Sequence, residues 1–326
     1  MVTTTFGNPW GISSSGEEIN DGGRDGEKQV LFLLYKDTSS GTYGYFYWVD
    51  EEEKGFIDPS SNYESNGAEI VYINQFYAND DIAVLSTMAH EFQHLCDYNQ
   101  KFVLDGNYTD RIYDESFDQA VPTLFNEGQS VLSEDLNGFS LQMSGNKGND
   151  FLFDVCDDYM ATISTASISF FTFNSGSDYG KGYLFWRFLY DTYGESTVIE
   201  ATHSPLIQPE NIESATGKKM DVLLQEFLLA IMQTESERKI NSKIKISTID
   251  KTITYFGTTG KSKGTFQPLD YVSGFPGKII SSENPYAIKL YKISPTSNGG
   301  NLEVGFTLEN IKKLSSYSIF TAIIDK

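Results

Sequence analysis

The feature that most constrains this chain is an apolar stretch, residues 82–96, that ionisable side chains interrupt at His90, Glu91 and His94. On a helix, the apolar residues would cover nearly every face, and a helix that is apolar all round is buried. Burying the ionisable side chains without partners would cost several kcal/mol. We therefore expect a buried helix over residues 81–101, begun by the capping cluster Asn79-Asp80-Asp81, whose polar side chains bind a metal ion. The apolar residues are Ile82, Ala83, Val84, Leu85, Met88, Ala89, Phe92, Leu95 and Cys96.

The spacing of the two histidines points to zinc. His90-Glu91-Phe92-Gln93-His94 is an HExxH motif, which puts both imidazoles on one helix face, one turn apart. Neutral imidazole is a favoured zinc ligand, and the neighbouring carboxylate can act as general base on a water that the zinc activates. The alternative is a helix with two incidental histidines, which the apolar surroundings disfavour. We predict His90 and His94 as zinc ligands and Glu91 as catalytic.

A catalytic zinc usually takes three protein ligands and leaves one position open. The extended motif with Gly at position 97 and a third His at position 100 does not apply, because the chain has Asp97 and Gln100 there. The remaining histidine, His203, lies in a loop-like context before Pro205. We interpret His203 as a surface residue, with a ligand or hydrogen-bonding role as the weaker alternatives.

The third ligand is therefore sought among acidic residues that follow the motif. Helical steps from Glu127 reach apolar residues on both sides of it, so its carboxylate takes a core-facing position that is rare unless it is paired or bound to metal. We favour Glu127 as the third metal ligand, with Asp114 and Glu115 as rivals. The acidic candidates are Asp110, Asp114, Glu115, Asp118 and Glu127, and the apolar residues in helical phase with Glu127 are Ala120, Leu124 and Val131.

The formal net charge of −21 limits the classes of partner. Such a surface repels nucleic-acid phosphates and anionic lipid headgroups, and no apolar run reaches the roughly 18 residues of a membrane span. Met1-Val2-Thr3-Thr4-Thr5 is typical of an expression start after a removed signal peptide. We expect a monomer that is secreted or attached to the cell surface. Cys96 and Cys156, the only cysteines, are expected as buried thiols rather than a disulfide.

The pattern along the chain predicts an α+β protein in three parts. Residues 1–78 read as a β-rich N-terminal subdomain, with a central strand over 30–35 and further strands over 43–49 and 69–74. Residues 79–240 read as a helical catalytic subdomain, and residues 241–326 as a small β-rich, sandwich-like domain. The expected helices are 81–101, 120–136, 180–193 and 218–238, and the expected C-terminal strands are 243–246, 252–256, 287–291 and 318–323.

With Phe125-Asn126-Glu127-Gly128 beside the HExxH motif, the chain resembles the gluzincins, zinc peptidases whose Glu ligand lies on the helix after HExxH. The Asn-Glu-Gly context is similar to the aminopeptidase N-like branch. Tyr179-Gly180-Lys181-Gly182 matches that branch's Tyr-x-Lys-Gly segment, so the resemblance implies that Tyr179 donates a hydrogen bond to the oxyanion. Over residues 28–238 the chain most resembles the hyicolysin-type neutral metalloproteases. Gln129-Ser130 departs from the more usual apolar residue after the glycine.

Two further segments have a functional and a simpler interpretation. Gly67-Ala68-Glu69 resembles the strand with which aminopeptidases hold a substrate's N-terminus, but one residue is missing and an ordinary edge strand that pairs with substrate is favoured. Residues 21–27 resemble a calcium turn, but they fail the EF-hand pattern. A plain glycine turn is favoured over a Ca²⁺ site.

We therefore expect a zinc-dependent metalloendopeptidase that hydrolyses peptide bonds of proteins, with a zinc-activated water and Glu91 as the general base. One alternative is an aminopeptidase that uses Glu69 to hold the substrate's amine. The other is a non-catalytic adhesion or binding protein with a structural zinc. Glu91 and Tyr179 favour the enzyme, because a structural site needs neither.

Overall fold

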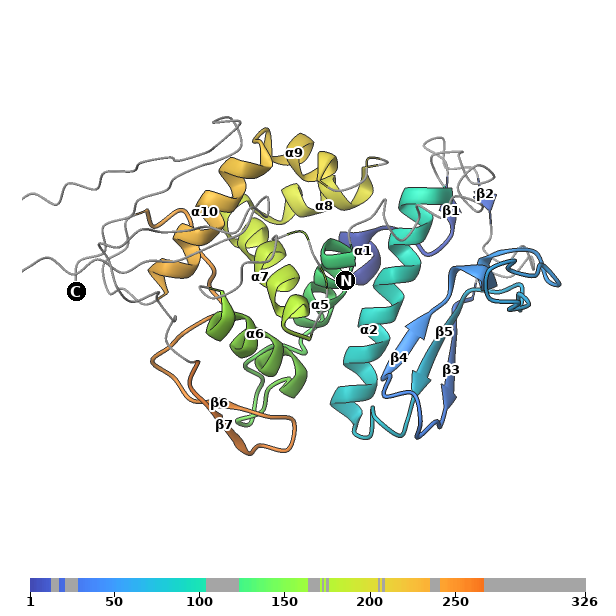
Figure 1. Ribbon diagram of the computed structural model, residues 1–326, viewed down its shortest axis with the longest axis horizontal. Helices are drawn as coiled ribbons and strands as arrows, with labels where there is room; N and C mark the ends of the chain where they lie inside the picture. Colours follow the sequence, from blue (N-terminus) through green and yellow to red (C-terminus); the bar gives the residue numbers. More distant parts are fainter. Residues whose placement is uncertain are drawn as a thin grey trace, which may run out of the picture.

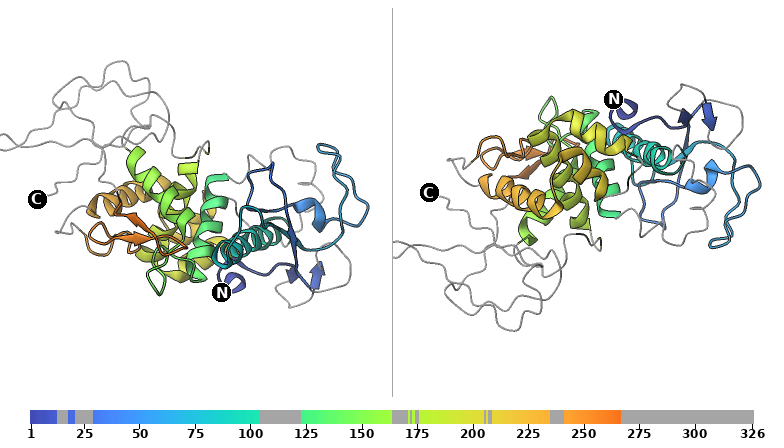
Figure 2. Two further views of the ribbon diagram at one scale, coloured as in Figure 1. Left: turned by 90° about the horizontal axis from the view of Figure 1, so that it is seen from below. Right: turned by 90° about the horizontal axis from the view of Figure 1, so that it is seen from above.

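The chain folds as a mixed α+β protein in which helices predominate and the main sheet is small. The computed structural model describes residues 1–12, 18–20, 29–103, 123–163, 171, 173, 176–204, 206, 209–234 and 241–266. In Figure 1 the long helix α2 (Asp81–Tyr98) runs between the sheet and the remaining helices, and both views in Figure 2 keep it there. No helix in the described ranges is long and apolar enough to cross a membrane.

The main sheet has the order β3-β5-β4, formed by β3 (Leu31–Tyr35), β5 (Ile70–Asn74) and β4 (Gly44–Phe46). β3 pairs with β5 in parallel and β4 pairs with it antiparallel. The prediction that the first apolar run is the central strand is wrong. β5 is central and buried along its length, whereas β3 leaves Leu31 47% and Leu34 51% exposed. Both runs are apolar, and only long-range pairing decides which one lies between two neighbours.

Helix α2 begins where the capping cluster predicts. The side chain of Asp80 accepts a hydrogen bond from the backbone N–H of Ala83 at 2.9 Å, as an N-cap residue does. The helix continues into a π-helical turn, η2 (Asn99–Val103), so the expected helix over 81–101 is confirmed. It is not buried all round, because Leu85 near its start is 48% exposed. The HExxH motif lies in the buried C-terminal half, between the sheet and α5 (Thr123–Leu136).

The expected helices 120–136, 180–193 and 218–238 correspond to α5, α7 (Gly176–Tyr193) and α10 (Met220–Gln233). The structure adds α6 (Asp150–Thr162), α8 (Glu195–His203) and α9 (Glu210–Thr216), which the sequence interpretation missed. α7 packs between α5 and α6 and brings Tyr183, Phe185 and Trp186 into the main core. α5, α6 and α7 thus share one hydrophobic core, and α5 is held in place by its packing on α7.

The N-terminal segment is structured rather than a loose start. Residues 2–6 form α1 (Val2–Phe6), which packs against α2 and α8 and buries Val2 and Phe6 in the main core. After it come the short paired strands β1 (Gly11–Ile12) and β2 (Glu18–Asn20). The expected strand over 43–49 is divided into β4 and the 3-10 helix η1 (Trp48–Glu51).

The chain after α10 is less regular than predicted. Residues 243–246 form irregular chain instead of a strand, and only Tyr255–Phe256 of the expected strand over 252–256 pairs, as β6 with β7 (Ser262–Gly264). Ile244, Ile246 and Tyr255 are buried in the same core as the helices. Packing on the helices accounts for the apolar spacing of Ile244 and Ile246 without a partner strand. The predicted strands 287–291 and 318–323 lie outside the described residues, and the domain boundary at residue 241 stays a prediction.

Candidate metal centre

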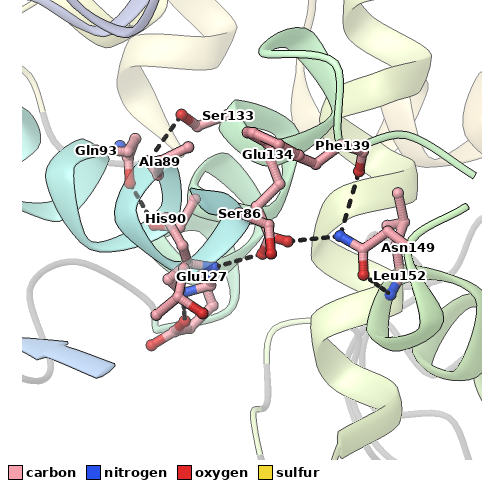
Figure 3. Close-up of polar contacts among 12 residues, drawn as sticks. Ser86, Ala89, His90, Gln93, Glu127, Ser133, Glu134, Phe139, Asn149 and Leu152 are labelled. Atoms are coloured by element: carbon pink, nitrogen blue, oxygen red, sulfur yellow. Dashed lines mark hydrogen bonds and ion pairs between the residues drawn. The ribbon is translucent and has the colours of Figure 1, made fainter. Parts of the chain in front are cut away.

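His90, His94 and Glu127 converge between α2 and α5. Each offers one ligand atom, and these atoms lie within 4.8 Å of one another. The Nε2 atoms of His90 and His94 lie 3.1 Å and 3.6 Å from the same oxygen, Oε2 of Glu127. Figure 3 shows Glu127 beside His90. The rival acidic residues Asp110, Asp114, Glu115 and Asp118 lie outside the described residues, as does the 21–27 turn.

The charges of this cluster offset one another. Burial opposes protonation of His90, but hydrogen bonds to Glu127 and Glu134 outweigh it and hold the His90 pKa well above 6.5. The His94 pKa is also raised against burial, by the charge of Glu127. Burial opposes ionisation of Glu127, and the two imidazoles outweigh it and lower the Glu127 pKa below 4.5. In the metal-free cluster, the imidazoles and the Glu127 carboxylate therefore favour each other's charged forms, in the position where a cation would offset the carboxylate.

The donor set fits a transition-metal ion. Two imidazole nitrogens and one carboxylate oxygen are the donors that Zn²⁺ takes in catalytic sites, where a fourth position stays open. The two Nε2 atoms face the same carboxylate oxygen, so one ion placed among them would meet three donors.

A second carboxylate, Glu134, orients His90 from behind. Its Oε1 lies 2.9 Å from Nδ1 of His90, and the Glu134 side chain is 5% exposed. An acceptor on Nδ1 keeps the proton there and leaves the lone pair of Nε2 for a metal, the arrangement found behind most metal-bound histidines. The sequence analysis missed Glu134. The available signal was its place seven residues after Glu127, two turns along the same helix face.

His94 has a different, uncharged partner behind it. The hydroxyl of Ser130 lies 3.2 Å from both ring nitrogens of His94. It donates to the side-chain oxygen of Gln93, whose amide nitrogen in turn donates to Gln129 at 2.9 Å. With its proton on Gln93, Ser130 accepts from the ring N–H of His94. Gln129 and Ser130, the two residues that depart from the family pattern, therefore form a polar connection between α5 and the motif helix.

Glu91 faces the sheet side of the motif helix. Its Oε2 accepts a hydrogen bond from the backbone N–H of Phe46 in β4 at 3.0 Å. Burial raises the Glu91 pKa above 4.5, while the charges of His90 and His94 lower it. A carboxylate with a raised pKa beside the candidate metal ligands is suited to accept and return a proton.

Tyr179 lies close to the cluster, in the first turn of α7. Its ring centroid is 6.3 Å from that of His90, and it also contacts Phe151 and Phe173. Burial raises the Tyr179 pKa, and the charges of Glu127 and Glu91 raise it further. The hydroxyl therefore stays protonated at neutral pH, as a hydrogen-bond donor must be.

A close approach of α5 and α7 sets the distance between Glu127 and Tyr179. A Cβ on Gly128 would lie 2.4 Å from the carbonyl carbon of Gly182, and a Cβ on Gly182 would lie 2.3 Å from the carbonyl oxygen of Leu124. Only glycine fits at both positions. The glycines of Asn-Glu-Gly and Tyr-x-Lys-Gly thus meet each other, which explains why both motifs contain one.

The other predicted residues lie apart from the cluster. Glu69 immediately precedes β5, the central strand, and is fully buried, so the edge-strand interpretation of Gly67-Ala68-Glu69 is wrong. His203 is exposed at the end of α8 and interacts with Thr5 and Lys101. Cys96 and Cys156 are buried free thiols, as predicted.

Comparison with known proteins adds no assignment. No family model matches the chain, and a search of curated proteins found no significant match. The gluzincin resemblance therefore depends on the motifs and on the geometry of the cluster.

Proposed function

We propose that this protein is a zinc-dependent metalloendopeptidase with a gluzincin-like site. One observation carries the proposal: His90, His94 and Glu127 converge from two helices, with Glu91 and Tyr179 close to them. A structural zinc site is closed by a fourth protein ligand, whereas a catalytic site keeps a position open. The three-residue cluster, beside a candidate base and a candidate hydrogen-bond donor, supports the catalytic alternative.

The residues divide the reaction among them. When bound, Zn²⁺ supplies Lewis-acid chemistry, because it lowers the pKa of a water towards 7 and polarises a carbonyl. Glu91 accepts the proton of the attacking water and passes it to the leaving amine. Tyr179 donates a hydrogen bond from its hydroxyl to the carbonyl oxygen as negative charge develops there. Glu134 keeps the His90 imidazole in the orientation that presents Nε2 to the ion, and Ser130 contacts the ring of His94.

The substrate class is proposed from the same site. Amide hydrolysis needs a base that returns its proton to a poor leaving group and a donor for the oxyanion, and Glu91 and Tyr179 can fill these roles. We favour internal bonds over N-terminal ones because the Glu69 carboxylate is fully buried before the central strand. Secretion or surface attachment and a monomeric state remain predictions.

A casein assay tests the proposal. The zinc-loaded protein should hydrolyse casein, a chelator should stop the reaction, and added Zn²⁺ should restore it. Failure of the zinc-loaded protein to cleave casein or a peptide library would favour a binding protein with a structural zinc. A peptide and its N-acetylated twin then separate the two peptidase types, because an endopeptidase cleaves both equally and an aminopeptidase cleaves only the free amine.

A further inference from the structure

Asn149 lies at the start of α6, two residue contacts away from the candidate metal ligands. It is the N-cap of that helix, and its Oδ1 accepts a hydrogen bond from the backbone N–H of Leu152 at 3.2 Å. Its Nδ2 donates to Oε2 of Glu134 at 2.8 Å and to the carbonyl of Phe139 at 3.2 Å. The residue is 3% exposed. Figure 3 shows the continuous row Leu152, Asn149, Glu134 and His90.

The chemistry of its partners fixes the orientation of the Asn149 amide. The backbone N–H of Leu152 can only donate, so the amide oxygen faces it. The carboxylate of Glu134 and the carbonyl of Phe139 can only accept, so the NH₂ group faces them. An inverted amide would lose all three hydrogen bonds in a site closed to water. Asn149 is therefore held as a donor towards Glu134.

This donor determines how Glu134 meets His90. Glu134 uses Oε2 for Asn149 and Oε1 for Nδ1 of His90. A carboxylate held at one oxygen by an immobile donor keeps its plane, and the other oxygen stays aimed at the imidazole. The residue before Glu134 also ties α5 to the motif helix, because Ser133 Oγ donates a hydrogen bond to the carbonyl of Ala89 at 2.9 Å.

We propose that Asn149 is a positioning residue of the metal site, which acts through Glu134 to hold the His90 imidazole with Nε2 towards the ion. The inference rests on the proposed zinc site. Through Asn149, the helix α6 influences the affinity for the metal although it contributes no ligand. Partners in the second coordination shell typically change metal affinity by about 10–100-fold when they are altered.

Zinc affinity of the full chain, measured by competition with a chromophoric chelator, tests the proposal. Asn149→Asp keeps an N-cap acceptor but replaces the donor with an oxygen that faces Glu134 at the same distance. Asn149→Ser also keeps a cap, adds no charge and cannot donate across the gap. We expect zinc affinity to fall by about tenfold or more in Asn149→Asp and by a smaller factor in Asn149→Ser. Asn146→Asp is the matched control. Asn146 is exposed in the same loop, and its substitution adds the same charge as Asn149→Asp.

A second readout separates positioning from a loss of stability. The chain has three histidines, so the ring N–H signals of the zinc-loaded protein, labelled with ¹⁵N-histidine, are few enough to assign. We expect a slowly exchanging Nδ1–H signal from His90 in the wild type and in Asn146→Asp, and faster exchange in Asn149→Ser.

Equal zinc affinity and equal Nδ1–H exchange in Asn149→Ser and the wild type would overturn the inference and leave the zinc site intact. A wild-type protein that takes up no zinc would overturn both proposals. The two failures are therefore distinguishable from the wild-type measurement alone.

Discussion

At the residue scale, the side chains of the cluster have partners that define their roles. His90 lies between Glu127 and Glu134, and His94 lies between Glu127 and Ser130. The unpaired burial of these groups would be costly, and the Glu134 carboxylate on Nδ1 of His90 leaves only Nε2 of that ring for a ligand. The cluster is therefore organised around one point between the two Nε2 atoms and Glu127.

The third histidine of the chain provides a matched test of the ligand set. His94→Ala should abolish stoichiometric zinc binding, because it removes one of three donors from a site that needs all of them. His203→Ala should bind zinc as the wild type does, because His203 is exposed at the end of α8. Zinc content by elemental analysis after dialysis is the measurement. Equal zinc in both variants would exclude His94 as a ligand.

Tyr179→Phe tests the hydrogen-bond donor. Loss of one donor to an oxyanion costs about 10²–10³-fold in kcat, and we expect a fall of that size with zinc content and Tm unchanged. Phe keeps the ring contacts with Phe151 and Phe173. Peptide hydrolysis under saturating substrate is the measurement, and an unchanged kcat would remove Tyr179 from the reaction.

At the element scale, three helices carry the site. α2 provides the two imidazoles and Glu91, α5 provides Glu127 and Glu134, and α7 provides Tyr179. The hydrogen bond of 2.9 Å from Asn126 to Asp97 ties α5 to α2, and the contact between Gly128 and Gly182 sets α5 against α7. The spacing of the functional groups thus follows from helix packing, whereas no single loop determines it.

The glycine contact gives a prediction about elements. Gly128→Ala should lower the free energy of unfolding by about 1–3 kcal/mol, because the added methyl group overlaps the backbone of α7 and a packed core resists overpacking. It should also weaken zinc binding, since Glu127 is the adjacent residue. Gly176→Ala is the control, because a Cβ at the start of α7 would meet nothing within 4 Å. Denaturant unfolding of both variants is the measurement, and equal stabilities would contradict the close approach.

Local sequence signals were sufficient for the elements that carry the predicted residues. The cap at Asp80 and the apolar run predicted α2, and the apolar phase around Glu127 predicted which face of α5 turns inward. α6 was missed although the same kinds of signal exist there, in the cap Asn149 and the buried Leu152, Phe153 and Cys156.

Strand order and the partners behind the ligands could not be predicted, for a physical reason. Whether an apolar strand lies at the centre or the edge of a sheet depends on pairing with distant segments, as the exposed β3 illustrates. Asn149 meets Glu134 only because α5 and α6 both pack on α7, which no local pattern encodes. The chain before α2 and after α10 was therefore predicted less well than helices α2 and α5.

At the scale of the whole molecule, the cluster links stability to pH and to metal. The raised pKa of His94 contributes stability to the metal-free protein below its unfolded value of 6.5, and this is lost as pH rises through the folded pKa. The lowered pKa of Glu127 contributes above 4.5 and is lost as pH falls through the folded pKa. The contribution of the metal-free cluster to the free energy of unfolding is therefore greatest between pH 4.5 and pH 6.5.

Thermal unfolding across pH tests this linkage. In metal-free protein, the Tm difference between wild type and His94→Ala should shrink as pH rises above 6.5, because the imidazolium–carboxylate pairs are lost. In zinc-loaded wild type, the Tm gain from zinc should grow over the same range, since fewer protons must be displaced. A zinc-induced gain that is largest below pH 6.5 would contradict the predicted protonation state.

The most direct measurement combines zinc content and peptide hydrolysis in Glu91→Gln. Because Glu91 provides no ligand atom to the cluster but is proposed to move the proton, this variant should bind zinc in the same stoichiometry as the wild type and lose hydrolysis. Glutamine keeps the shape and an acceptor for the backbone N–H of Phe46 but cannot accept the water's proton. Hydrolysis at the wild-type rate by the zinc-loaded Glu91→Gln variant would contradict the proposed mechanism.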